Sequence, residues 1–152
     1  MGINSTAQEL KLTVQRLLQG DELVFMKAHF GSNHWMVYHA LSSAKKRVAI
    51  LFLNPAITAS MKQILPKTIE AITLDGIDQL TDIDVLVIEQ CEMLEDLLPI
   101  ELKKLQNALQ TTQCSKLMVA GFMTLRVFFK LKELVAKPFR GYLLGGLNVI
   151  RG

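Results

Sequence analysis

The chain has 152 residues, half of them hydrophobic, and a formal net charge of +3. This length suits one domain with a sizeable core, and no apolar run approaches the ~20 residues that a membrane-spanning helix needs. The first residues lack the basic and apolar regions of a signal peptide, and Cys91 and Cys114 form no Cys-x-x-Cys motif. We therefore expect a single domain over residues 1–152, in the cytoplasm and away from the membrane, with reduced cysteines.

The first half of the chain predicts alternating helices and strands. Leu10, Val14 and Leu17 recur at helical spacing within a predicted helix over residues 5–18, with Ser5 or Thr6 as its cap. Strands are predicted over residues 23–28 and 47–54, and helices over residues 33–44 and 56–65. Residues 68–73 fit either a strand or a poorly formed helix, and residues 76–80 fit a helical turn.

The second half continues this alternation. It predicts a strand over residues 83–89, a helix that begins near Pro99 and ends at 111, a strand over 116–121 and a helix over 124–135. Residues 141–151 close the chain as a strand or hairpin. Because the apolar runs at 47–54, 83–89 and 116–121 do not alternate with polar residues, their strands are expected to be covered on both faces. The predicted fold is an α/β three-layer sandwich with a mostly parallel central sheet.

Residues 28–35 have the position and length of a phosphate-binding loop, between the first strand and the following helix. A loop of the GxxxxGK[ST] type needs small residues around the phosphates, a lysine for the terminal phosphate and a hydroxyl for magnesium. Gly31 and Ser32 suit this chemistry, but Asn33 takes the late glycine position and His34 the lysine position. Trp35 stands where the magnesium-binding hydroxyl is required.

The strand over residues 83–89 ends in a second altered motif. Four apolar residues, 85–88, precede Glu89 and Gln90, where nucleotide hydrolases carry Asp-Glu. A glutamine cannot accept a proton, so the hydrolytic step loses its base. Together with the loop at 28–35, this pattern predicts no catalytic residues.

The order of elements over residues 17 to about 140 resembles the P-loop NTPase superfamily with both Walker motifs lost. DVLVIEQCEML, IELKKLQNALQ and KLMVAGF are similar in layout to DnaA/Hda-like AAA+ proteins, and RLLQGDELVFMKAHFGS resembles RecA-like cores. The resemblance implies a vestigial nucleotide site at Gly31, Ser32, Asn33, His34 and Glu89. It also implies that the strand over residues 116–121 lies beside the one that ends at Glu89.

Such a family member acts by binding. The resemblance implies a non-catalytic pseudo-ATPase without cofactor, serving as a protein-interaction or regulatory subunit in DNA replication, recombination or repair. Two alternatives stay open: a DNA-binding accessory factor, and a nucleotide-binding enzyme with an atypical loop. No metal site is expected, because His29, His34 and His39 do not share a helical face and have no carboxylate or cysteine at ligand spacing.

Charge is distributed unevenly along the chain. Residues 68–102 contain ten acidic residues and no lysine or arginine, whereas residues 114–152 contain seven basic residues and one acidic residue. The two segments form either solvated faces or oppositely charged surfaces, which would suit a homo-oligomer or a protein partner. Trp35, Phe128 and Phe129 are candidate partner contacts.

The basic C-terminal third is also a candidate nucleic-acid surface. Arg126, Lys130, Lys137 and Arg140 could neutralise phosphates, and the neighbouring aromatic residues Phe139 and Tyr142 could stack on unpaired bases. The alternative interpretation is a solvated face beside an apolar helix.

Overall fold

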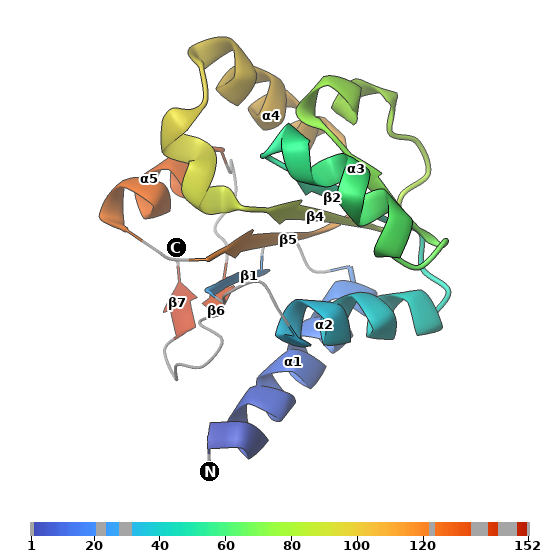
Figure 1. The fold of residues 1–152 in the computed structure, drawn as a ribbon. Helices are drawn as coiled ribbons and strands as arrows, with labels where there is room; N and C mark the ends of the chain where they lie inside the picture. The colour runs from blue at the N-terminus through green and yellow to red at the C-terminus, as the bar shows by residue number, and fades with distance from the viewer. Residues whose placement is uncertain are drawn as a thin grey trace.

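Helices and strands alternate along the computed structural model, which describes residues 2–20, 24–27, 32–121, 124–134, 140–142 and 149–151 (Figure 1). The elements up to the middle of the chain are α1 (Gly2–Leu18), β1 (Val24–Lys27), α2 (Ser32–Ser43), β2 (Val48–Phe52), α3 (Pro55–Ile64), β3 (Ile69–Ile72) and the 3₁₀ helix η1 (Leu74–Gln79). They are followed by β4 (Val85–Glu89), the 3₁₀ helix η2 (Cys91–Asp96), α4 (Pro99–Thr111), β5 (Ser115–Ala120), α5 (Leu125–Leu134), β6 (Arg140–Tyr142) and β7 (Val149–Arg151).

The strands form one sheet in the order β3-β2-β4-β5-β1-β6-β7. Every neighbouring pair is parallel except β6 and β7, which are antiparallel. Residues 69–72 are therefore a strand, and the alternative of a poorly formed helix is wrong. The expected closing strand or hairpin is present as β6 and β7, while Gly145 and Gly146 lie outside the described residues.

Helices cover both faces of the sheet, which confirms the predicted three-layer α/β sandwich. One apolar cluster joins α1, α2 and α3 to one face, and a second joins η1, η2, α4 and α5 to the other. Figure 1 shows α1 and α2 on the opposite side of the sheet from α4 and α5. Along β2, Ala49 lies in the second cluster and Ile50 in the first, so a continuous apolar strand is buried on both faces.

Local capping explains two of the helix starts. Asn54 caps α3 by accepting a hydrogen bond from the Ala56 N–H at 3.1 Å, and Pro55 follows as the first helical residue. In α4, Pro99 opens the helix as predicted, and Glu101 reaches back to the Leu98 N–H at 2.9 Å. These contacts fix the ends of two helices next to the sheet.

Helix α1 begins at Gly2, one turn before the predicted start at residue 5. Ser5 and Thr6 therefore lie inside the helix and not at its start, so the prediction that one of them caps it is wrong. None of the described helices is both long and apolar enough to cross a bilayer.

Candidate functional site

The candidate site lies at the edge of the sheet where its parallel strands end. Ligands of open parallel α/β sheets bind outside the carboxyl ends of the strands. Here β4 ends at Glu89 and its parallel neighbour β5 ends at Ala120, with β1 next to β5. The predicted adjacency of the strand ending at Glu89 and the strand over residues 116–121 is confirmed.

Helix α2 follows β1 and begins at Ser32. Of the predicted nucleotide-site residues, Gly31 lies outside the described residues. Ser32, Asn33 and His34 form the first turn of α2, and the structure describes their backbone but not their side chains. The backbone thus places the segment at the entry to α2, as the sequence predicts, whereas the role of these three side chains stays a prediction.

The Glu89 carboxyl group is buried and hydrogen-bonded to a tyrosine. Its residue is 2 % exposed, and the Tyr38 hydroxyl of α2 donates a hydrogen bond to Glu89 Oε1. Tyr38 itself is completely buried in the cluster beneath α2. A buried phenol needs a partner for its hydroxyl, and Glu89 provides an acceptor for it.

The Tyr38 ring is part of a series of aromatic contacts along α2. Trp35 is half-buried and meets the Tyr38 ring edge-to-face, with the ring centroids 6.3 Å apart. The centroid of the Trp35 ring also lies 5.9 Å from that of the His39 ring, and His39 is exposed. Trp35, proposed from sequence as a partner contact, therefore also packs against the core that holds Tyr38.

Gln90 has a structural contact of its own at the end of β4. Its backbone is left-handed, with φ of 66°, and its side-chain Oε1 accepts a hydrogen bond from the Asn54 N–H at 3.0 Å. Since Asn54 caps α3, Gln90 ties the end of β4 to the turn between β2 and α3. The Gln90 amide thus holds two strand ends together.

Residues just after Gln90 join β4 to β5. The Glu92 carboxylate accepts the Gly121 N–H through both oxygens, at 2.9 and 3.2 Å. A Cβ atom added at Gly121 would lie 2.7 Å from Glu92 Oε2, so a larger residue at this position would require the Glu92 carboxylate to move. The side chains of Glu89, Gln90 and Glu92 at this edge therefore all bond to the protein itself.

Cys91 is completely buried in the second apolar cluster and donates to the Ile88 carbonyl at 3.4 Å. Burial raises the pKa of the Cys91 thiol well above its usual range, and the charge of Glu89 raises it further. A thiol that stays protonated is a poor nucleophile. This agrees with packing rather than catalysis at Cys91.

The basic residues predicted to contact DNA are brought together only in part. Arg126 is exposed on α5, and Lys130 on the same helix is half-buried and lies 3.8 Å from the Glu133 carboxylate. Both line a hollow of about 350 Å³ with Phe129, but Glu95 and Glu133 line it too. Lys137 lies outside the described residues, and Arg140 belongs to β6 with its side chain not described.

Of the two phenylalanines proposed as partner contacts, the structure describes the side chain of Phe129 alone. Phe129 is 56 % exposed on α5, as a contact residue requires. For Phe128 the structure describes the helical backbone but not the side chain.

Sequence reasoning missed Tyr38, Asn54, Glu92 and Gly121. The spacing of Tyr38, one turn after Trp35 on the apolar face of a helix, is a signal that could have marked it. In the part of the chain that the structure describes, no three metal-ligating side chains gather where they could hold a metal ion.

The chain was also compared with known proteins. No family model matches it, and a search of curated proteins found no match either.

Proposed function

We propose that the chain is a non-catalytic pseudo-ATPase, acting as a protein-interaction or regulatory subunit in DNA replication, recombination or repair. It would have a degenerate P-loop core of the DnaA/Hda-like AAA+ or RecA-like kind and would work in the cytoplasm. The observation that carries the proposal is the hydrogen bond from Tyr38 to the buried Glu89 carboxyl.

This hydrogen bond bears directly on magnesium chemistry. Mg²⁺ keeps several waters and is bound through carboxylates together with substrate phosphates. Glu89 is the carboxylate in the position for that role, but it is 2 % exposed and holds a phenol. Binding a hydrated ion there would require breaking a buried hydrogen bond and opening the contact between α2 and β4.

The neighbouring position supports the same conclusion. Gln90 cannot act as a base, and its amide oxygen is occupied by the Asn54 backbone. The two positions that would supply the metal ligand and the base thus stabilise the fold instead. The adjacency of β4 and β5, which the resemblance implies, also supports a P-loop-like core.

Exposed apolar side chains on α5 favour an interaction role. Leu125 is 75 % and Phe129 is 56 % exposed, and their spacing of four residues places them on one face of the helix. A face of this kind suits a protein partner or a second copy of the chain.

A magnesium–ATP titration with a phosphate-release assay tests the absence of catalysis. We expect no heat of binding and no turnover from the wild-type chain, and the same from Glu89→Gln. Turnover that Glu89→Gln abolishes, while Glu95→Gln preserves it, would establish the alternative of a nucleotide-binding enzyme with an atypical loop. Glu95 is a suitable control because it is an exposed carboxylate on η2.

Sedimentation of the purified chain, alone and with the proteins that co-purify with it, tests the interaction role. We expect self-association or a stable complex that weakens in Leu125→Ala with Phe129→Ala. The control is Met36→Ala with Ile64→Ala, which removes exposed apolar side chains from α2 and α3. A monomer that retains no partner would contradict the proposal.

The second candidate function is a DNA-binding accessory factor. It is favoured by the exposed Arg126 beside Lys130 and Phe129 on one hollow of α5. A gel-shift assay at low salt tests it, with binding lost in Arg126→Ala with Lys130→Ala as the supporting result.

A further inference from the structure

A second hollow lies at the opposite edge of the sheet, where β2, β3 and β4 begin. It has a volume of about 390 Å³ and is formed by the loop before β2 and the loop before β3. Seven residues supply its polar lining: Ser42, Lys45, Lys46, Arg47, Lys67, Thr68 and Glu70. We call it the amino-edge hollow.

Backbone hydrogen bonds shape the first wall at the end of α2. The Lys45 N–H bonds to the Ser42 carbonyl at 3.0 Å, and the Lys46 N–H bonds to the Leu41 carbonyl at 3.5 Å. Lys45 has a left-handed backbone, with φ of 58°. This is the Schellman arrangement that ends many helices, with lysine at the position where glycine is usual.

A side-chain contact joins the two walls. The hydroxyl groups of Ser42 and Thr68 are 2.6 Å apart and hydrogen-bonded. It links the last turn of α2 to the loop between α3 and β3. The hollow is therefore held from both sides by contacts that do not use its charged side chains.

The charge of the hollow is strongly positive. Four cationic side chains line it, against one carboxylate, that of Glu70. The nearby Asp84 carboxylate accepts the Arg47 backbone N–H at 2.9 Å. Within the described ranges, none of the four cationic side chains forms an ion pair or a hydrogen bond. Like charges gathered without partners attract an anion.

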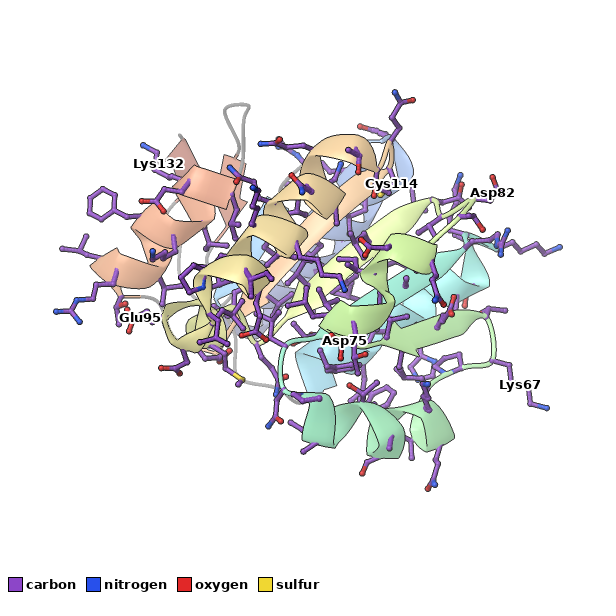
Figure 2. The ribbon with its side chains drawn as sticks, turned by 90° about the horizontal axis from the view of Figure 1, so that it is seen from above. Lys67, Asp75, Asp82, Glu95, Cys114 and Lys132 are labelled. Atoms are coloured by element: carbon purple, nitrogen blue, oxygen red, sulfur yellow. The ribbon has the colours of Figure 1, made fainter. Side chains whose placement is uncertain are left out.

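The amino-edge hollow is separate from the hollow on α5. In Figure 2, Lys67 and Asp82 extend from one side of the molecule, and Glu95 and Lys132 lie at the other. The amino-edge hollow also lies at the opposite edge of the parallel sheet from Glu89.

We propose that the amino-edge hollow binds the phosphate backbone of a nucleic acid. Several cations on two neighbouring loops suit successive phosphates, and whichever of the Ser42 and Thr68 hydroxyls accepts the hydrogen bond between them can donate its own hydrogen to a phosphate oxygen. No aromatic ring lines this hollow, so stacking on bases contributes nothing and sequence preference is absent. The site does not rest on the proposed pseudo-ATPase role and would stand if that role failed.

Fluorescence anisotropy with a labelled oligodeoxythymidylate tests the site on the full chain. For four phosphate contacts, at about −0.7 each on a single strand, the slope of log affinity against log salt is about −3. Lys45→Gly with Lys67→Gln should halve that slope and lower affinity on the order of tenfold at low salt. Because glycine favours the backbone of residue 45, this variant should not unfold the protein.

The matched control is Lys11→Gln with Lys103→Gln, which removes the same net charge from exposed positions on α1 and α4. We expect its affinity to stay within twofold of the wild type. Equal losses in both double variants would overturn the site, as would the absence of any oligonucleotide binding. Loss of binding in Arg126→Ala with Lys130→Ala alone would place the contact on α5 instead. Polyglutamate binding in place of oligonucleotide would overturn the assignment to a nucleic acid.

Discussion

Replacing Tyr38 with phenylalanine removes one hydroxyl group and leaves an aromatic ring of nearly the same volume. In the folded chain this hydroxyl donates to the Glu89 carboxyl, and both residues are buried. The variant keeps the edge-to-face contact with Trp35 and the packing against the sheet. Its effect on stability therefore reports on the hydrogen bond at the candidate site.

The expected loss of unfolding free energy is about 1–3 kcal/mol, since a buried carboxyl loses a donor that it cannot replace with bulk water. With a urea m-value of about 1–3 kcal/mol/M, the unfolding midpoint should fall by roughly 1 M. Glu89→Leu should also destabilise the chain, because it removes the acceptor of the phenol. Tyr38→Phe with Glu89→Leu should cost less than the sum of the two single changes, because both single changes break the same hydrogen bond.

Equilibrium unfolding in urea, followed by circular dichroism, measures these differences. Thr111→Val is the control, because it removes a hydroxyl that bonds to the Asn107 carbonyl on the exposed surface of α4. Its effect should stay within about 0.5 kcal/mol. If Tyr38→Phe cost no more than this control, the hydrogen bond would not stabilise the candidate site. The inference that this bond keeps Glu89 from binding a metal ion would then be refuted.

Four further results are expected. Lys45→Gly should raise the unfolding free energy by about 0.5–1 kcal/mol, because glycine adopts the left-handed backbone more readily; no gain in urea unfolding would refute this. Glu92→Ala and Gly121→Ala should each destabilise by about 1 kcal/mol, and less than additively in combination, because both break the same contact; additive losses would show that the two residues act separately. Cys91 should react with iodoacetamide at pH 8 more slowly than the half-buried Cys114, and peptide mapping by mass spectrometry measures the two rates. Because burial raises the pKa of Cys91 in the folded chain, the unfolding free energy should also fall as pH rises above about 9, and a flat profile between pH 8 and 10 would contradict this.

Much of the local structure followed from patterns in the sequence. The uninterrupted apolar runs predicted strands covered on both faces, and all five residues of β2 and of β4 are buried. Proline marked the starts of α3 and α4, because its fixed φ and missing N–H suit the first turn of a helix. The first turn of α1 was missed, since Gly2 and Asn4 have low helix propensity.

The candidate site was predictable in position but not in chemistry. Glu89 and Gln90 could be found as polar residues after an apolar strand, and the strand beside them could be named. The hydrogen-bond partners of these two side chains could not be predicted from the sequence, because Tyr38 is 51 residues from Glu89 and Asn54 is 36 residues from Gln90. No local pattern encodes which distant group satisfies a buried polar atom.

The sequence by itself determined the class of fold and the alternation of helices and strands. These depend on burial and on residue chemistry, which are properties of short segments. Only the tertiary structure decided the strand order, the hydrogen bond from Tyr38 to the buried Glu89, and the amino-edge hollow, which lysines from two separate loops line. These depend on long-range packing of the whole sheet, which brings together residues that are far apart in the chain.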